Sequence, residues 1–243
     1  MLAFLNTPVG VAYHVVLALS QFLAPLTGGL ATAAAIIVFT LAVRLLLSPL
    51  SFTALRGQAR IAALQPRIAE LRARYSRQPD RLQRELTALY ATEGGGLLAG
   101  CLPLLLQLPF FSVVYRLLES ATVAGGSNLL LSKRLLAAPL GSHWLTGAGP
   151  VSLQGLVFLG VFALIGAVCF VAARVTRTTA PTPAAGRIIS GALPYLTLVI
   201  AAFVPLAAGL YLLTSTTWTA AERAIWRRRT GAGGQNPTSG AGR

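Results

Sequence analysis

The sequence predicts an all-α polytopic membrane protein with five membrane-spanning helices, a helical hairpin outside the membrane and an N-terminal interfacial helix. Two observations carry this prediction. The chain is 55% hydrophobic but only 11% charged, with a mean hydropathy of +0.69, whereas soluble domains contain about 25% charged residues. Several uncharged stretches also approach or exceed the roughly 20 residues that a spanning helix needs.

Residues 1–28 contain an apolar stretch from Val9 to Ala24 that is interrupted by polar side chains. This stretch is short for a bilayer-spanning helix. We therefore expect a helix that lies at the membrane interface, with a short span as the alternative. Residues 29–50 follow as the first expected span.

The central feature of residues 29–50 is Arg44, an arginine inside a long apolar run. An arginine within a spanning helix costs roughly 2.5–3.5 kcal/mol on insertion scales, so it normally faces a protein interior or a wet cavity. Thr40 and Ser48 lie four residues before and after it and share its helix face. The alternative is that Arg44 lies near the cytoplasmic end and only extends its side chain to the interface. This segment by itself favours neither interpretation.

Residues 51–95 form an arginine-rich, amphipathic segment in which apolar residues recur at helical spacing. The first series is Ile61, Leu64, Ile68, Leu71 and Tyr75, and the second is Leu82, Leu86 and Leu89. Pro79 separates the two series, because proline disfavours helix at the residue before it. Asp80 with Gln83 resembles a capping box that opens the second helix. We therefore expect a cytoplasmic helical hairpin rather than a solvated linker.

The other expected spans are residues 96–118, 151–173, 188–204 and 205–222. The last two come from one uncharged stretch that is too long for a single helix across a core of about 30 Å, so the chain should turn near Pro205. An extracytoplasmic loop at 119–150, a basic cytoplasmic loop at 174–187 and a basic, disordered tail at 223–243 complete the chain.

Basic residues are distributed unequally between the two sides of the predicted spans. The hairpin, the 174–187 loop and the tail are rich in arginine, whereas the opposite loop contains only Lys133 and Arg134. Lysine and arginine accumulate on the cytoplasmic side. We expect a multi-pass protein of the bacterial plasma membrane, with the N-terminus outside and the C-terminus in the cytoplasm.

The sequence contains no pattern that indicates an enzyme, a metal site or a cofactor. His14 and His143 are far apart, and neither a zinc motif nor a phosphate-binding glycine loop is present. Acidic residues occur in the spans only at their ends, as Glu119 and Glu222, which argues against an intramembrane carboxylate relay. A binding or conduit function is therefore favoured.

Five segments of the chain, in their order, resemble the YidC/Oxa/Alb family of membrane protein insertases. They are RLLLSPL from Arg44, LQPRIAELRARY at 64–75, RELTALYATEG at 84–94, GCLPLLLQLPFFSVVY at 100–115 and GLYLLTSTTWTAAER at 209–223. The resemblance extends from about residue 29 to residue 229, and the length and beginning of the chain are similar to the short actinobacterial type. Gly95 and Gly96 depart from the family, which commonly has Asn-Pro there.

The resemblance implies a membrane protein insertase and chaperone that moves short polar segments through a hydrophilic groove and releases helices into lipid, alone or with the Sec translocase. Arg44 would supply the charge of the groove. The other expected groove residues are Thr40, Ser48, Gln107, Gln154 and the cluster Thr214–Thr219, in particular Thr214 and Trp218. For the two glutamines, Thr214 and Trp218 the alternative is ordinary interhelical packing.

The resemblance also implies that the hairpin makes the first contact with substrate or translocase. The arginines expected at that contact are Arg60, Arg67, Arg72, Arg74 and Arg84. The expected partners are nascent membrane proteins, the lipid bilayer, the Sec translocase and, through the basic tail and loops, the ribosome, but not DNA. Retention of the tail in the cytoplasm is the favoured explanation of its arginines. A small-solute or anion channel or carrier, and an assembly factor that does not insert its clients, are the alternative functions.

Overall fold

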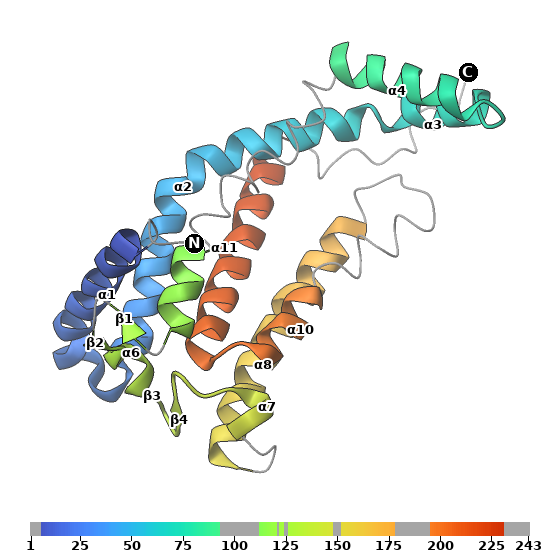
Figure 1. Ribbon diagram of the computed structural model, residues 1–243. Helices are drawn as coiled ribbons and strands as arrows, with labels where there is room; N and C mark the ends of the chain where they lie inside the picture. Colours follow the sequence, from blue (N-terminus) through green and yellow to red (C-terminus); the bar gives the residue numbers. More distant parts are fainter. Residues whose placement is uncertain are drawn as a thin grey trace.

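The computed structural model describes residues 6–92, 112–120, 122–123, 126–147, 152–177 and 195–230. This part of the chain is mostly helical (Figure 1). The helices are α1 (Asn6–Thr27), the 3-10 turn η2 (Gly28–Leu30), α2 (Ala31–Ala63), α3 (Gln65–Arg74), α4 (Pro79–Thr92), α6 (Leu129–Ser132), α7 (Trp144–Gly147), α8 (Leu153–Arg177), α10 (Leu196–Phe203) and α11 (Leu206–Thr230). Residues 112–119 are also helical. Two short antiparallel hairpins pair β1 (Thr122–Val123) with β2 (Gly126–Ser127) and β3 (Arg134–Leu135) with β4 (Ala138–Pro139).

Two stretches of the described chain are long and apolar enough to cross a membrane, Thr7–Arg74 and Leu153–Arg174. Their outer surfaces carry large apolar side chains, among them Phe22 with 73% and Leu26 with 77% of its surface exposed. Such a surface suits a lipid environment better than water. The expected span at 96–118 lies mostly outside the described residues.

Helix α1 packs along α2. Val16 of α1 and Ala33 and Ala35 of α2 are buried in the core, and the Ser20 and Thr32 hydroxyls lie 2.9 Å apart across the two helices. The chain reverses between them at Gly28, which adopts a φ of +55° that side chains with a Cβ disfavour.

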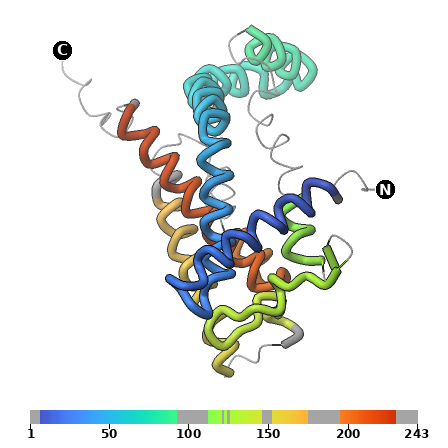
Figure 2. The backbone as a smooth tube through the Cα atoms, turned by 90° about the vertical axis from the view of Figure 1, so that its left-hand side faces the viewer, coloured from blue at the N-terminus to red at the C-terminus, as the bar shows by residue number. Residues whose placement is uncertain are grey.

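Helix α2 continues beyond residue 50, where the first span was expected to end, and carries Pro49 within it. Leu64 separates α2 from α3, and Pro66 lies in the first turn of α3, where a missing N–H is tolerated. The chain then turns back into α4, so α3 and α4 lie side by side away from the other helices (Figures 1 and 2). The least exposed residues of α4 include Leu82, Leu86 and Leu89, the apolar series read from the sequence.

The helical body is formed by α2, α8 and α11, with α10 beside α8 (Figure 1). Phe158 and Ile165 of α8 and Leu206 of α11 are almost completely buried in its core. Helix α10 ends before Val204, whose backbone is extended as expected for a residue that precedes a proline.

The segment 126–147, expected as part of a loop, folds against the start of α11. The Leu206 N–H donates to the Ser142 carbonyl at 3.0 Å, and the Ala207 N–H donates to the Leu140 carbonyl at 2.9 Å. These bonds satisfy N–H groups that have no partner within a helix. Leu130 and Leu140 are buried, so this segment contributes to the core.

The end of α11 differs from the expected boundary at residue 222. The helix includes Arg223 and the arginines at 227, 228 and 229, and it ends at Thr230. Arginine is a good helix former, and cations at a helix C-terminus interact favourably with the helix dipole. The expectation of a disordered tail therefore does not apply to residues 223–230, while residues 231–243 lie outside the described chain.

Candidate functional site

Arg44 on α2 faces α11, where its Nε donates to the Ser215 hydroxyl at 3.4 Å. Ser215 is buried, with 4% of its surface exposed, and Arg44 is half-buried. The distance exceeds the usual 2.9–3.0 Å for such a bond, so the interaction is weak. This contact of the arginine is thus with a neutral hydroxyl inside the helical body.

The two hydroxyl residues expected on the Arg44 face are satisfied within their own helix. Thr40 is 2% exposed, and its hydroxyl donates to the Ile36 carbonyl at 2.7 Å. Ser48 is half-buried and donates to the Leu45 carbonyl at 2.8 Å. Both therefore add polarity to α2 without a buried hydroxyl that lacks a partner.

The threonines of α11 are accommodated in the same way. Thr214 donates to the Leu210 carbonyl at 2.8 Å, and Thr219 donates to the Ser215 carbonyl at 2.9 Å. Such bonds to the preceding turn explain how a helix of the body carries so many hydroxyls. Ser215, rather than the predicted Thr214, is the residue that meets Arg44.

Trp218 and Glu222 are exceptions to this pattern of internal hydrogen bonding. The Trp218 Nε1 atom and the Glu222 Oε1 atom are buried, and within the described part of the chain neither has a hydrogen-bond partner. Glu222 as a whole is 6% exposed. Leaving a buried polar group without a partner costs about 1–3 kcal/mol.

The spacing of Ser215, Trp218, Glu222 and Trp226 places these residues on one face of α11. This face is directed at α2 at both ends. Ser215 accepts from Arg44, and the Trp226 ring lies 6.3 Å from that of Phe52, with the Arg56 guanidinium 6.0 Å from the Trp226 ring centre. We call Arg44, Ser215, Trp218 and Glu222 the polar strip.

The sequence prediction included Ser215 only as part of the Thr214–Thr219 cluster, and it did not include Glu222 in the groove. The signal that could have found them is the spacing of three and four residues through Ser215, Trp218 and Glu222, which is the period of a helix face that packs on a neighbour.

Gln154 does not belong to the polar strip. It lies in the first turn of α8, about two helical turns before Val161. Val161 is level with Gly209 of α11, where an added Cβ would lie 3.7 Å from the Val161 side chain. Since α8 and α11 run in the same direction (Figure 1), Gln154 and Ser215 are separated by about 20 Å along the helix axes. Gln107 lies outside the described residues.

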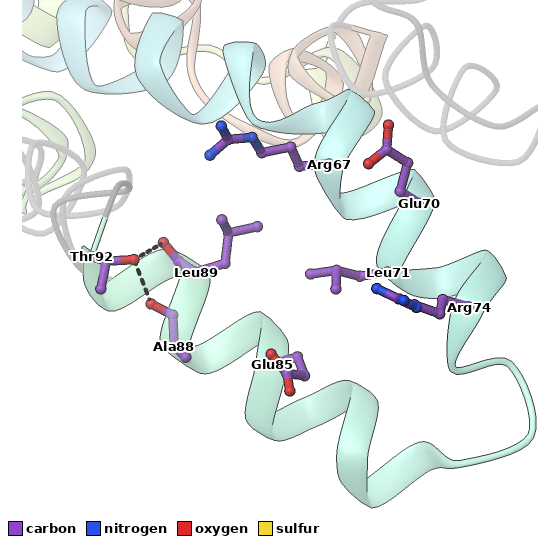
Figure 3. A pocket seen from close by; sticks show the side chains of 8 residues that line it. All are labelled: Arg67, Glu70, Leu71, Arg74, Glu85, Ala88, Leu89 and Thr92. Atoms are coloured by element: carbon purple, nitrogen blue, oxygen red, sulfur yellow. Dashed lines mark hydrogen bonds between the residues drawn. The ribbon is translucent and has the colours of Figure 1, made fainter.

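A separate pocket of about 360 Å³ lies between α3 and α4 (Figure 3). Its lining combines charged and apolar side chains from both helices. The lining residues are Arg67, Glu70, Leu71, Arg74, Glu85, Ala88, Leu89 and Thr92. Of the five hairpin arginines predicted from the sequence, the structure brings Arg67 and Arg74 together here.

The other three predicted hairpin arginines lie elsewhere. Arg60 and Arg72 are exposed on α2 and α3. Arg84 is exposed on α4, and its Nε donates to the Asp80 carbonyl at 3.3 Å. Arg81 stacks on Tyr75 with 5.3 Å between the guanidinium carbon and the ring centre, which ties α4 to the end of α3.

The described residues contain no group of three or more histidine, cysteine, aspartate or glutamate side chains that could hold a metal ion. The side chains of the polar strip can form hydrogen bonds and electrostatic interactions with a ligand. The strip can provide a positive charge, a hydroxyl, an indole N–H and a carboxylate oxygen within the helical body.

Most of the chain matches a known protein family. The family model described as 60Kd inner membrane protein matches residues 22–232. The membrane protein insertase YidC of Chlamydia caviae is 32% identical over 184 residues, which cover 75% of this chain and 22% of the relative. The YidC of Helicobacter pylori strain 26695 is 38% identical over 97 residues, which cover 40% of this chain and 18% of the relative. The chain thus matches only about a fifth of the length of these relatives.

Proposed function

Because this chain belongs to the family of 60Kd inner membrane proteins, we propose that it is a membrane protein insertase that moves short polar segments of nascent membrane proteins across the bilayer. The relatives it matches are named as membrane protein insertases, and this is not a family of enzymes. The observation that carries the proposal is the position of Arg44, half-buried between α2 and α11 at the Ser215 hydroxyl.

Arg44 would attract the acidic or polar part of a substrate that has to cross the membrane. A pair of opposite charges 4 Å apart gains about 1 kcal/mol in water but about 4 kcal/mol at the effective dielectric constant of a protein surface region. The neighbouring hydroxyls of α2 and α11 would keep this region polar and hydrated, and so lower the barrier for a short polar segment. This region is the hydrophilic groove of our proposal.

The apolar helix of the substrate would leave the groove sideways into lipid. Burial of its side chains in the acyl chains provides the free energy for this step, at about 25 cal/mol for each Å² of apolar surface. The scheme needs no nucleotide and no cofactor.

We further propose the arrangement of the chain in the bacterial plasma membrane. Five helices would span it, with the N-terminus outside, the C-terminus in the cytoplasm, and α3 and α4 forming a cytoplasmic hairpin. The arginines of α3, α4 and the end of α11 support this orientation. The pocket of Figure 3, with Arg67 and Arg74, would make the first contact with substrate or with the Sec translocase. The ribosome would contact the basic tail and loops.

The test is insertion into proteoliposomes that contain only this protein. A single-span substrate with an acidic translocated tail is added, and protease protection of the tail is compared with that in empty liposomes. Protection above the empty control is expected. If well-folded protein gives no protection, the insertase proposal fails; binding of the substrate without protection would then indicate an assembly factor, and anion flux in the same liposomes would indicate a channel.

A further inference from the structure

We propose that Trp218 and Glu222 form a binding site for the main chain of the translocating segment. The Trp218 indole N–H would donate to a carbonyl of the segment, and the Glu222 carboxylate would accept one of its N–H groups. This inference rests on the proposed function, because its occupant is the polar segment that an insertase passes across the membrane.

Trp218 and Glu222 each have a buried side-chain atom that finds no hydrogen-bond partner among the described residues. Most buried polar atoms in folded proteins are hydrogen-bonded, and each exception calls for an explanation. Around these two residues, Thr214 and Thr219 are satisfied by carbonyls of α11 itself. Among the residues that the structure describes, the Trp218 Nε1 and Glu222 Oε1 atoms have no such partner, so they are available to a ligand that enters the strip.

Trp218 and Glu222 combine one hydrogen-bond donor with one acceptor. An indole N–H can only donate a hydrogen bond, and an ionised carboxylate can only accept one. A cation would suit Glu222 but not the indole N–H, and an anion would suit Trp218 but be repelled by the carboxylate. A polypeptide main chain carries one donor and one acceptor at each residue, so a single ligand of this class satisfies both groups.

The spacing of Trp218 and Glu222 along α11 is close to the spacing of main-chain groups in an extended segment. Trp218 and Glu222 are four residues apart on α11, a rise of about 6 Å. An extended chain presents its N–H and C=O groups to the same side at every second residue, about 6.8 Å apart. A segment that runs along α11 in an extended conformation could therefore meet both groups.

Main-chain recognition would add to the role of Arg44 without demanding a particular sequence. Arg44 binds at Ser215 on the same face of α11, so it could hold an acidic side chain while Trp218 and Glu222 hold the adjacent backbone. Hydrogen bonds to the main chain supply affinity that does not depend on side chains. This arrangement suits a protein whose clients share polarity but not sequence.

The experiment uses the full chain with Trp144→Phe and Trp226→Phe, so that Trp218 is the only tryptophan. Ultraviolet resonance Raman spectroscopy of the protein in detergent micelles reports whether the Trp218 N–H is hydrogen-bonded. The probe is a synthetic acidic peptide with the sequence of the substrate's translocated tail, and a matched peptide carries N-methyl groups along its backbone. The N-methylated peptide keeps its carbonyls but lacks the N–H groups that Glu222 would bind.

We expect the Trp218 band to be that of a free N–H without peptide and to shift to that of a hydrogen-bonded N–H with the unmodified peptide. Glu222→Leu should weaken peptide binding about tenfold, whereas Glu222→Gln, which keeps an acceptor oxygen, should retain most of it. N-methylation should weaken binding to the wild type by a similar factor and have little further effect on Glu222→Leu. Thr217→Val is the control, because Thr217 is exposed and its hydroxyl donates to the Leu213 carbonyl.

Three results would overturn the inference. The first is a Trp218 band that already indicates a hydrogen-bonded N–H without peptide, which would assign the site to water. The second is a band that the peptide does not shift. The third is that N-methylation of the peptide and Glu222→Leu weaken binding by independent factors that multiply. A shift by the peptide without protease-protected insertion would instead reject the insertase proposal and retain the main-chain site. Insertion without any shift would reject the main-chain site alone.

Discussion

Arg44 and Ser215 are 171 residues apart in the chain, yet the Arg44 Nε lies 3.4 Å from the Ser215 hydroxyl oxygen. The contact joins α2 to α11 inside the helical body. It directs a permanent positive charge towards a helix in which the hydroxyls of Thr214 and Thr216 donate to carbonyls of their own helix. The predictions below follow from this contact and from the packing that creates it.

Removal of the Arg44 charge should lower insertion of a substrate with an acidic tail about tenfold, because roughly 1.4 kcal/mol of attraction corresponds to a factor of ten. Arg44→Lys should retain more activity than Arg44→Ala. Protease protection in proteoliposomes provides the measurement, and Arg134→Ala, which changes an exposed arginine on β3, is the control. Equal losses with acidic and neutral tails would show that Arg44 acts through packing and not through its charge.

Substitution of Ser215 should change the behaviour of Arg44, whereas substitution of Thr216 should not. Ser215→Ala removes the hydroxyl that accepts a hydrogen bond from Arg44. The loss of one such bond lowers the net stability by about 0.5–1.5 kcal/mol. Thr216 donates to the Leu212 carbonyl at 2.8 Å, so Thr216→Val tests the loss of a hydroxyl on the same helix. Insertion of the acidic-tail substrate is compared for the two variants. A larger loss for Thr216→Val would contradict the position assigned to Arg44.

The turn between α1 and α2 should depend on Gly28 but not on Gly29. Gly28 has a φ of +55°, and no neighbouring atom lies within 4 Å of an added Cβ at either glycine. The conformation, rather than a lack of space, therefore opposes a side chain at Gly28. Gly28→Ala should destabilise the protein by about 1–2 kcal/mol, and Gly29→Ala should be neutral or slightly stabilising. Thermal unfolding in detergent distinguishes the two; equal melting temperatures would argue against the left-handed turn.

Asn128 should be essential for the packing of the segment that supports the start of α11. Its side chain is 5% exposed. The amide donates to the Leu117 and Ser120 carbonyls at 2.7 and 3.0 Å. Asn128→Ala should cost about 2–3 kcal/mol of stability, and Asn128→Asp at least as much, because a carboxylate cannot donate. Unfolding curves in detergent measure this, with Ser132→Ala, an exposed hydroxyl, as the control. A neutral Asn128→Ala would show that these bonds do not hold the segment.

The proposed orientation predicts which positions a membrane-impermeant thiol reagent reaches in intact cells. Arg72 on α3 and Ser132 on α6 are both exposed and can be replaced by cysteine after Cys101 and Cys169 have been changed to serine. Ser132→Cys should be labelled from outside, and Arg72→Cys only after the cells are permeabilised. The reverse pattern would invert the orientation.

Two properties of this protein could be read from its sequence, namely its helical character and the position of a charged residue, Arg44, within a long apolar run. Both follow from local physical chemistry. Hydrophobicity over about 20 residues decides membrane insertion, and a charge in such a run is costly however the helices pack. The apolar series Leu82, Leu86 and Leu89 of α4 could likewise be read from helical spacing.

The tertiary structure decided which polar residues share a site. The sequence offered Gln154 and the whole cluster Thr214–Thr219, whereas the structure places Ser215 of that cluster against Arg44 and Gln154 about 20 Å away along the helix axes. The rotation and axial position of each helix produce this difference. They are set by long-range contacts, such as Gly209 against Val161 and the Leu140 carbonyl at the start of α11. No local pattern encodes such contacts, because they depend on how the surfaces of several helices fit together.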